Sequence, residues 1–136
     1  MRVIYNGEVK SIDDVPASSS GWLEGEGIFE TVKSVGNKPF SLSRHIARAQ
    51  SSAVALGITI SNSDQISQGV SDLFAAVPHG LGMLRISFDN QGNWLAVHMP
   101  YAEQEKSCNV RMHPGAVTGD VHKRFPYTNR LEILEQ

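Results

Sequence analysis

The sequence predicts an α+β domain, in which two helices pack on one face of an antiparallel sheet. Two turn dipeptides, Asn6-Gly7 and Gly36-Asn37, each separate short stretches rich in strand-forming residues and indicate hairpins. Two stretches near the middle of the chain place apolar residues at helical spacing. Two further strand-like stretches follow them. Hairpins dominate this mixture, and hairpins make antiparallel sheets.

The two hairpins come first. Residues 2–5 alternate well enough for a short strand, and residues 8–10 return from the turn at Asn6-Gly7. Residues 28–35 are rich in β-branched and aromatic side chains, and residues 38–40 return after the second turn.

The first helix is predicted to run to about Leu56, with Ser41 or Ser43 as its N-cap and Gly57 at its C-cap. Its apolar stripe consists of Ile46, Ala49, Ala53 and Leu56. Its polar face contains Arg44, His45, Arg48 and Ser52 and no acidic residue.

The second helix begins at Ser63-Asp64 and ends before Pro78, with Ile66, Val70, Leu73, Phe74 and Val77 on one side. Residues 81–88 and 94–99 are predicted strands joined by a turn, and residues 109–113 form a further one. Residues 129–134 look like the start of another helix.

Composition narrows the class of protein. The chain has 136 residues and a formal net charge of −2, and its charges divide evenly between its two halves. This distribution argues against a nucleic-acid binder, which needs clustered Lys and Arg for phosphates. No apolar stretch is long enough to span a membrane, and the single cysteine, Cys108, excludes an intramolecular disulfide. We therefore expect a soluble cytoplasmic protein.

The arginine pair on the first helix has two interpretations. Arg44 and Arg48 lie four residues apart, and Arg suits phosphate because its planar fork offers several donors. A solvated basic face is the alternative, and composition alone favours it. Arg85 alternates with Leu84 and Ile86 in a predicted strand, so it should lie on the other face of the sheet.

The lysines and histidines indicate a functional site less specifically than the arginine pair does. Lys123 stands between His122 and Arg124, and neighbouring cationic groups lower the pKa of an amine toward a nucleophilic form. A surface basic triplet is the alternative. No metal site is expected, because the histidines are scattered and Cys108 has no Cys-x-x-Cys partner.

The order of several motifs resembles the N-terminal half of the class IV aminotransferases, the fold-type IV pyridoxal-phosphate enzymes. The resemblance is dense from residue 21 to 58, through Gly25-Glu-Gly-Ile-Phe-Glu-Thr31, Pro39-Phe40, His45-Ile-Ala-Arg48 and Leu56-Gly57. It resumes at Asn129-Arg-Leu-Glu132. The family includes branched-chain aminotransferases, D-amino-acid aminotransferases and aminodeoxychorismate lyases.

The resemblance implies a role for each matching position. Arg48 corresponds to the arginine that binds the cofactor phosphate, and Lys123 to the Schiff-base lysine. Phe29 and Glu30 match strand positions on the substrate side. His45 matches a histidine that helps to form the carboxylate pocket in some members. Arg85 is similar in position to an arginine on the corresponding strand of some branched-chain enzymes, and it could bind a substrate carboxylate or simply be solvated.

Two positions depart from the family pattern. In most members the lysine stands three residues before the Asn-x-Leu segment, where this chain has Pro126. Either the loop is longer here, which we prefer, or the lysine has been lost. Many members have Arg-Gly after the strand at 81–88, where this chain has Phe88-Asp89-Asn90.

The resemblance implies a pyridoxal 5'-phosphate enzyme, an aminotransferase or a lyase, that acts on an amino acid, a keto acid or an amino-deoxychorismate-like substrate as a homodimer. We expect residues 1–120 to form the N-terminal domain and residues 121–136 to begin a second, truncated one, so that this chain alone is inactive. The alternative is a non-catalytic domain that serves dimerisation or ligand binding.

Overall fold

The computed structural model of the protein describes residues 1–16, 27–103, 107 and 124–125. Their strands form one antiparallel sheet in the order β2-β1-β6-β5-β3-β4, and β7 pairs with the start of β3. The strands are β1 (Arg2–Tyr5), β2 (Glu8–Ser11), β3 (Gly27–Val35), β4 (Lys38–Pro39), β5 (Leu81–Phe88), β6 (Trp94–Pro100) and β7 (Arg124–Phe125). The helices are η1 (Ile12–Asp14), α2 (Leu42–Leu56) and α3 (Ser63–Ala76).

Both predicted hairpins are present. The φ angles are positive at Asn6 and Gly7, and again at Gly36 and Asn37, all between 51° and 90°. Positive φ at both central residues is the requirement of the turn that matches strand twist, and Asn and Gly tolerate it best. The two hairpins contribute β1–β2 and β3–β4 to opposite edges of the sheet.

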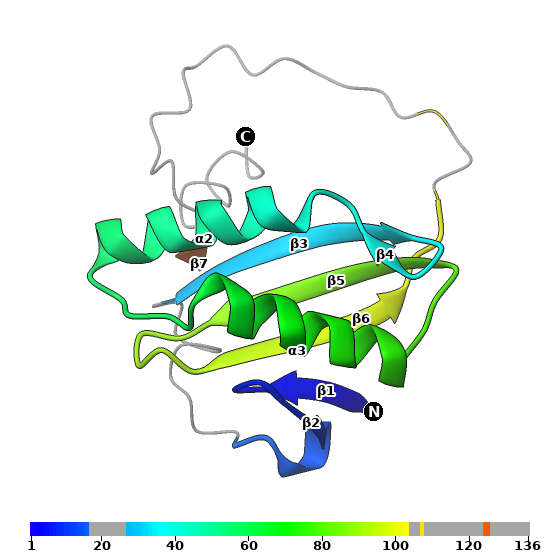
Figure 1. Cartoon of the computed structure of the whole chain (residues 1–136), viewed down its shortest axis with the longest axis horizontal. Helices are drawn as coiled ribbons and strands as arrows, with labels where there is room; N and C mark the ends of the chain where they lie inside the picture. Colours follow the sequence, from blue (N-terminus) through cyan, green and yellow to red (C-terminus); the bar gives the residue numbers. More distant parts are fainter. Residues whose placement is uncertain (17–26, 104–106, 108–123, 126–136) are drawn as a thin grey trace.

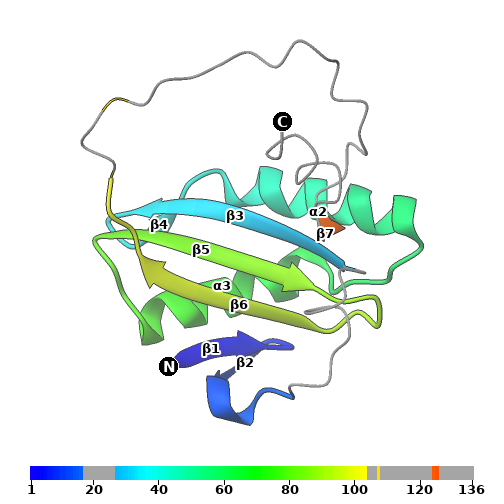
Figure 2. The ribbon, with the colours of Figure 1, turned by 180° about the vertical axis from the view of Figure 1, so that it is seen from behind.

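Both helices lie on the same face of the sheet (Figure 1), and the view from behind shows the other face turned toward the reader (Figure 2). The predicted α+β class, with two helices on one face of an antiparallel sheet, is confirmed. Between the layers lies the core, whose strand residues include Ile28, Val32, Leu84, Ile86 and Trp94 and whose helix residues include Ile46, Ala49, Ile66, Val70 and Leu73.

The prediction for α2 is right in its extent and wrong in two details. Gly57 caps the helix with φ 68°, as predicted. Ser41 occupies the N-cap position with φ 52°, but its side chain makes no capping hydrogen bond. Ser52 does not belong to a solvated polar face, because it is buried with Ile46 and Ala53 against the sheet.

Helix α3 starts at Ser63, as predicted, and Asn62 caps it by accepting a hydrogen bond from the backbone N–H of Gln65 at 2.9 Å. It ends at Ala76, two residues before Pro78. No helix in the described part of the chain is long and apolar enough to cross a membrane.

Several predictions lie outside the described residues. They are the strand at 109–113, the helix at 129–134, Cys108, Lys123, Pro126 and the domain division at residue 120.

Candidate functional site

The first half of α2 brings two basic side chains onto a carboxylate of β3. Arg48 donates from Nε to Oε1 of Glu30 at 2.7 Å and from Nη2 to Oε2 of the same carboxylate. Nδ1 of His45 lies 2.7 Å from Oε2. Residues 45 and 48 share one face of the helix because they are three apart. Three of the residues singled out from the sequence therefore meet in one cluster.

The carboxylate of this cluster lies in the protein interior. Glu30 is 2% exposed, because its side chain points from β3 toward α2, as do those of Ile28 and Val32. Burial alone would raise the pKa of Glu30, but the hydrogen bonds from Arg48 and His45 and their charge hold the pKa below its usual value. The same hydrogen bond raises the pKa of Arg48. The cluster therefore contains a stable carboxylate–guanidinium pair.

The outward side of the cluster retains hydrogen-bond donors. A carboxylate only accepts, so His45 donates its Nδ1 proton to Glu30 and leaves Nε2 as its outer nitrogen. Glu30 occupies the Nε–H and one Nη2–H of Arg48. A guanidinium has five N–H donors, so Glu30 leaves three of them unused on a side chain that is 45% exposed, and within the described residues the further contact of Nη2 is with Nδ1 of His45 at 3.3 Å.

These outer groups border a hollow of about 390 Å³, lined by Phe40, Ser41, Arg44, His45 and Arg48. The phenyl ring of Phe40 is largely exposed at its rim. The sequence indicated Ser41 as an N-cap and Phe40 as part of a family motif, but neither as a site residue. The spacing of residues 41, 44, 45 and 48 along one helix face could have identified Ser41 as a neighbour of the arginines.

Two other predicted residues, Phe29 and Arg85, lie on the opposite face of the sheet. Successive strand residues point to opposite sides, so Phe29 points away from α2 while Glu30 points toward it. Arg85 of β5 pairs with Thr31 of β3 and is therefore a diagonal neighbour of Phe29. Its guanidinium carbon lies 4.3 Å from the centroid of the Phe29 ring. Arg85 is exposed, whereas Leu84 and Ile86 are buried on the helix side, as predicted.

The start of β3 is also where the chain returns at β7. Gly27 pairs with Phe125 and Ile28 with Arg124. Lys123 itself lies outside the described residues, but Arg124 follows it directly in the sequence. The cluster and the Phe29–Arg85 pair therefore lie on opposite faces of β3, next to the residues with which β7 pairs.

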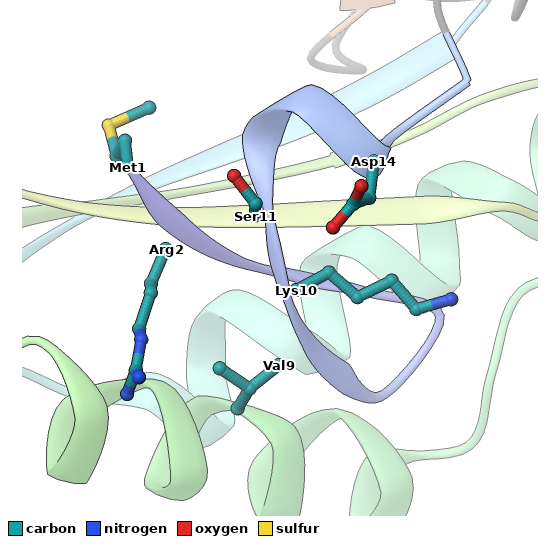
Figure 3. A pocket seen from close by; sticks show the side chains of 6 residues that line it. All are labelled: Met1, Arg2, Val9, Lys10, Ser11 and Asp14. Carbon is teal, nitrogen blue, oxygen red and sulfur yellow. The ribbon is translucent and has the colours of Figure 1, made fainter.

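A second hollow, of about 890 Å³, lies beside the β1–β2 hairpin (Figure 3). It contains none of the predicted site residues, and the long side chains of Arg2 and Lys10 point in different directions there. Within the described residues, no group of three or more His, Cys, Asp or Glu could hold a metal ion. The cluster on β3 and α2 is therefore the stronger candidate site.

Comparisons with known proteins identify the family and the fold of the chain. The sequence profile of the family described as amino-transferase class IV matches residues 27–126. Comparison with curated protein sequences finds no match.

Solved structures give the same fold. A putative branched-chain amino acid aminotransferase from Thermotoga maritima superposes with a TM-score of 0.74 at 20% identity, over 99% of this chain and 53% of its own. A putative 4-amino-4-deoxychorismate lyase gives 0.67 at 22% identity, over 93% and 57%. The PLP-bound form of a hypothetical aminotransferase from Mycobacterium tuberculosis gives 0.59 at 17% identity, over 74% and 39%.

The chain thus spans about half of the first two structures and less of the third. The family profile covers most of the chain, from β3 through all the elements that build the cluster. The chain belongs to the amino-transferase class IV family.

Proposed function

We propose that this chain is the N-terminal half of a pyridoxal-phosphate-dependent aminotransferase or lyase, and that Arg48 binds the phosphate of the cofactor. The observation that carries the proposal is the state of Arg48: one edge of its guanidinium is fixed by Glu30, and the other retains three donors beside the hollow. Phosphate oxygens are strong acceptors for that donor set.

The residues of the cluster suit the cofactor. Arg44, Arg48 and the outer nitrogen of His45 give the hollow a basic lining suited to an anionic phosphate. Pyridoxal phosphate, when bound, supplies an electron sink for amino-acid chemistry, while the protein supplies orientation and charge. Arg48 would fix the phosphate end, so that the aldehyde end is held at a set distance from it.

Lys123 is the proposed lysine that bonds the cofactor and moves the substrate proton with its Nζ. Support comes from its neighbour Arg124, which pairs with Ile28, one residue from Phe29 and two from Glu30. The proposal therefore expects Lys123 beside this end of β3, because the covalent chain ties it to Arg124.

The substrate class is an amino acid with its keto acid, or an amino-deoxychorismate-like compound. Arg85 supports it: its exposed guanidinium, which lies over the buried ring of Phe29, can pair with a substrate carboxylate. His45 lies with Arg48 on the helix side of the sheet, so its Nε2 would form a hydrogen bond at the hollow beside Arg48 and not beside Phe29 and Arg85. We further propose that the protein is a cytoplasmic homodimer. Sedimentation of the purified chain tests its oligomeric state.

The test is chemical trapping on the full chain. The protein is mixed with pyridoxal phosphate, reduced with borohydride and digested, and the labelled peptides are identified by mass spectrometry. We expect the label on Lys123 at substoichiometric cofactor and a strong loss of label in Arg48→Ala.

Lys38→Ala, which removes another lysine of the chain, is the matched control and should leave the labelling of Lys123 unchanged. Label spread evenly over all the lysines, or unchanged in Arg48→Ala, would overturn the proposal. Labelling that is unchanged in Arg48→Ala is the result expected of a non-catalytic domain.

A further inference from the structure

We infer that Glu30 is a positioning residue, whose carboxylate holds Arg48 and His45 in the orientation that phosphate binding needs. This inference rests on the proposed function, since it concerns how the phosphate-binding arginine is placed. It differs from the substrate-side role that the family resemblance implied for Glu30, because the side chain points into the helix layer.

The first argument is the geometry of the pair. The carboxylate engages the Nε–Nη2 edge of Arg48 with both oxygens, and this fork-to-fork contact fixes the plane of the guanidinium. A free arginine side chain on a helix surface samples many rotamers, and ordering it on binding lowers affinity. Because Glu30 already orders the side chain of Arg48, phosphate binding does not have to restrict it.

The second argument is that one carboxylate orders two partners. Oε2 accepts from His45 as well as from Arg48, and Nη2 of Arg48 lies 3.3 Å from Nδ1 of His45. Arg48 and His45 both line the hollow. The backbone of β3 supplies a rigid base for both.

The third argument is the location of the charge. Glu30 is 2% exposed, so its carboxylate contacts Arg48 and His45 from behind and contributes no oxygen to the lining of the hollow. Burying a carboxylate is unfavourable unless it is fully hydrogen-bonded, and here three donors satisfy it.

A purely electrostatic role of Glu30 and a positioning role predict opposite effects of Glu30→Gln on phosphate binding. If Glu30 acted only through its negative charge, its removal would strengthen phosphate binding, because the charge of Arg48 would no longer be compensated. If Glu30 positions Arg48, the same substitution weakens phosphate binding. The sign of the change therefore decides between the two.

The experiment measures dissociation constants of pyridoxamine 5'-phosphate and pyridoxamine by equilibrium dialysis. The two ligands differ only in the phosphate, and neither has the aldehyde that bonds a lysine. The affinity for pyridoxamine 5'-phosphate divided by the affinity for pyridoxamine therefore reports the phosphate contact alone, and we call it the affinity ratio. The proteins are the full chain, Glu30→Gln, Arg48→Ala and the double variant, with Glu8→Gln as a control that removes one exposed carboxylate.

We expect the ratio to fall about three- to tenfold in Glu30→Gln, in the range that ordering one side chain accounts for. Glu8→Gln should leave it unchanged, and the double variant should equal Arg48→Ala. In ¹⁵N spectra, Glu30→Gln should shift the Nε–H signal of Arg48 and speed its exchange with water. If Glu30→Gln does not fold, Glu30→Asp replaces it, because shortening the side chain keeps the charge and withdraws the contact.

The possible failures are distinct. A ratio that rises or stays constant in Glu30→Gln, while Arg48→Ala lowers it, overturns the positioning role and leaves the proposed function standing. A ratio that Arg48→Ala does not change overturns both.

Discussion

The hydroxyl of Ser34 donates a hydrogen bond across 2.8 Å to Nε2 of His98, and both residues are buried. The direction follows from the other nitrogen of the ring, because Nδ1 must donate to the carbonyl oxygen of Val77, which only accepts, at 2.8 Å. The ring of Phe74 stacks on the imidazole with centroids 4.0 Å apart. The arrangement fits a neutral histidine, and it links β3, β6 and the end of α3.

This pair predicts a loss of stability in mild acid. Burial lowers the pKa of His98 and outweighs the hydrogen bond with the carbonyl oxygen of Val77, which raises it, while the neighbouring His79 lowers it by a smaller amount. The unfolded chain therefore binds more protons than the folded chain below the ordinary histidine value of about 6.5, and the free energy of unfolding falls as pH drops below it. Urea unfolding at pH 7.5 and 5.5 measures this difference.

The control for that experiment is His98→Gln, which removes the titrating ring and should flatten the profile between pH 5.5 and 7.5. The same slope in this variant as in the natural chain would contradict the assignment to His98.

Gly82 is predicted to be intolerant of a side chain. A Cβ at this position would lie 2.3 Å from Nε2 of His98 and 2.6 Å from Oγ of Ser34. Gly82→Ala should therefore lower the free energy of unfolding by about 1–3 kcal/mol, the usual effect of overpacking. Gly80→Ala is the matched control, since nothing lies within 4 Å of its Cβ position. Equal thermal midpoints for both variants would refute the contact.

The two helix N-termini should respond oppositely to substitution. Asn62→Ala removes the hydrogen bond to the backbone of Gln65 and should destabilise the protein by about 1 kcal/mol. Ser41 makes no capping bond and has φ 52°. Glycine adopts that conformation without steric cost, so Ser41→Gly should stabilise by up to about 1 kcal/mol. Chemical denaturation of both variants checks the signs.

Glu30 should dominate the more acidic part of the stability profile. Its pKa is lowered below the ordinary 4.5, since its hydrogen bonds and paired charges outweigh burial. Its stabilisation is complete above pH 4.5 and is lost as pH falls through the folded-state value. Glu30→Gln should flatten stability below pH 5. Glu8→Gln, which removes only an exposed ion pair with Lys10, should leave the profile nearly unchanged.

The sequence predicted the elements whose signals are local. The positive φ angles at Asn6 and Asn37 and the cap at Gly57 each depend on one residue's backbone preference, and all are present. Two predictions on α2 failed because tertiary contacts decided them. Ser52 has a polar side chain but faces the sheet, and Ser41 adopts a conformation in which its hydroxyl does not cap.

The site was predictable residue by residue but not as an arrangement. Family resemblance indicated Phe29 and Glu30 together, whereas strand alternation sends them to opposite faces, where Arg85 meets one and Arg48 the other. From the sequence, His98 is only one of five scattered histidines for which no metal site is expected. Its place two residues from Ala96 in β6 indicates the buried face, but its contact with Ser34 depends on the β5–β6 and β3–β5 registers, which no local pattern determines.

The alternation of β3 limits how this segment can change its length. Inserting or deleting a single residue between Gly27 and Val32 would exchange the two faces. A carboxylate would then project from the side that now carries Phe29, and a phenyl ring would press against the guanidinium of Arg48. Loops elsewhere in the described chain can gain or lose residues one at a time, whereas this stretch can change only by pairs.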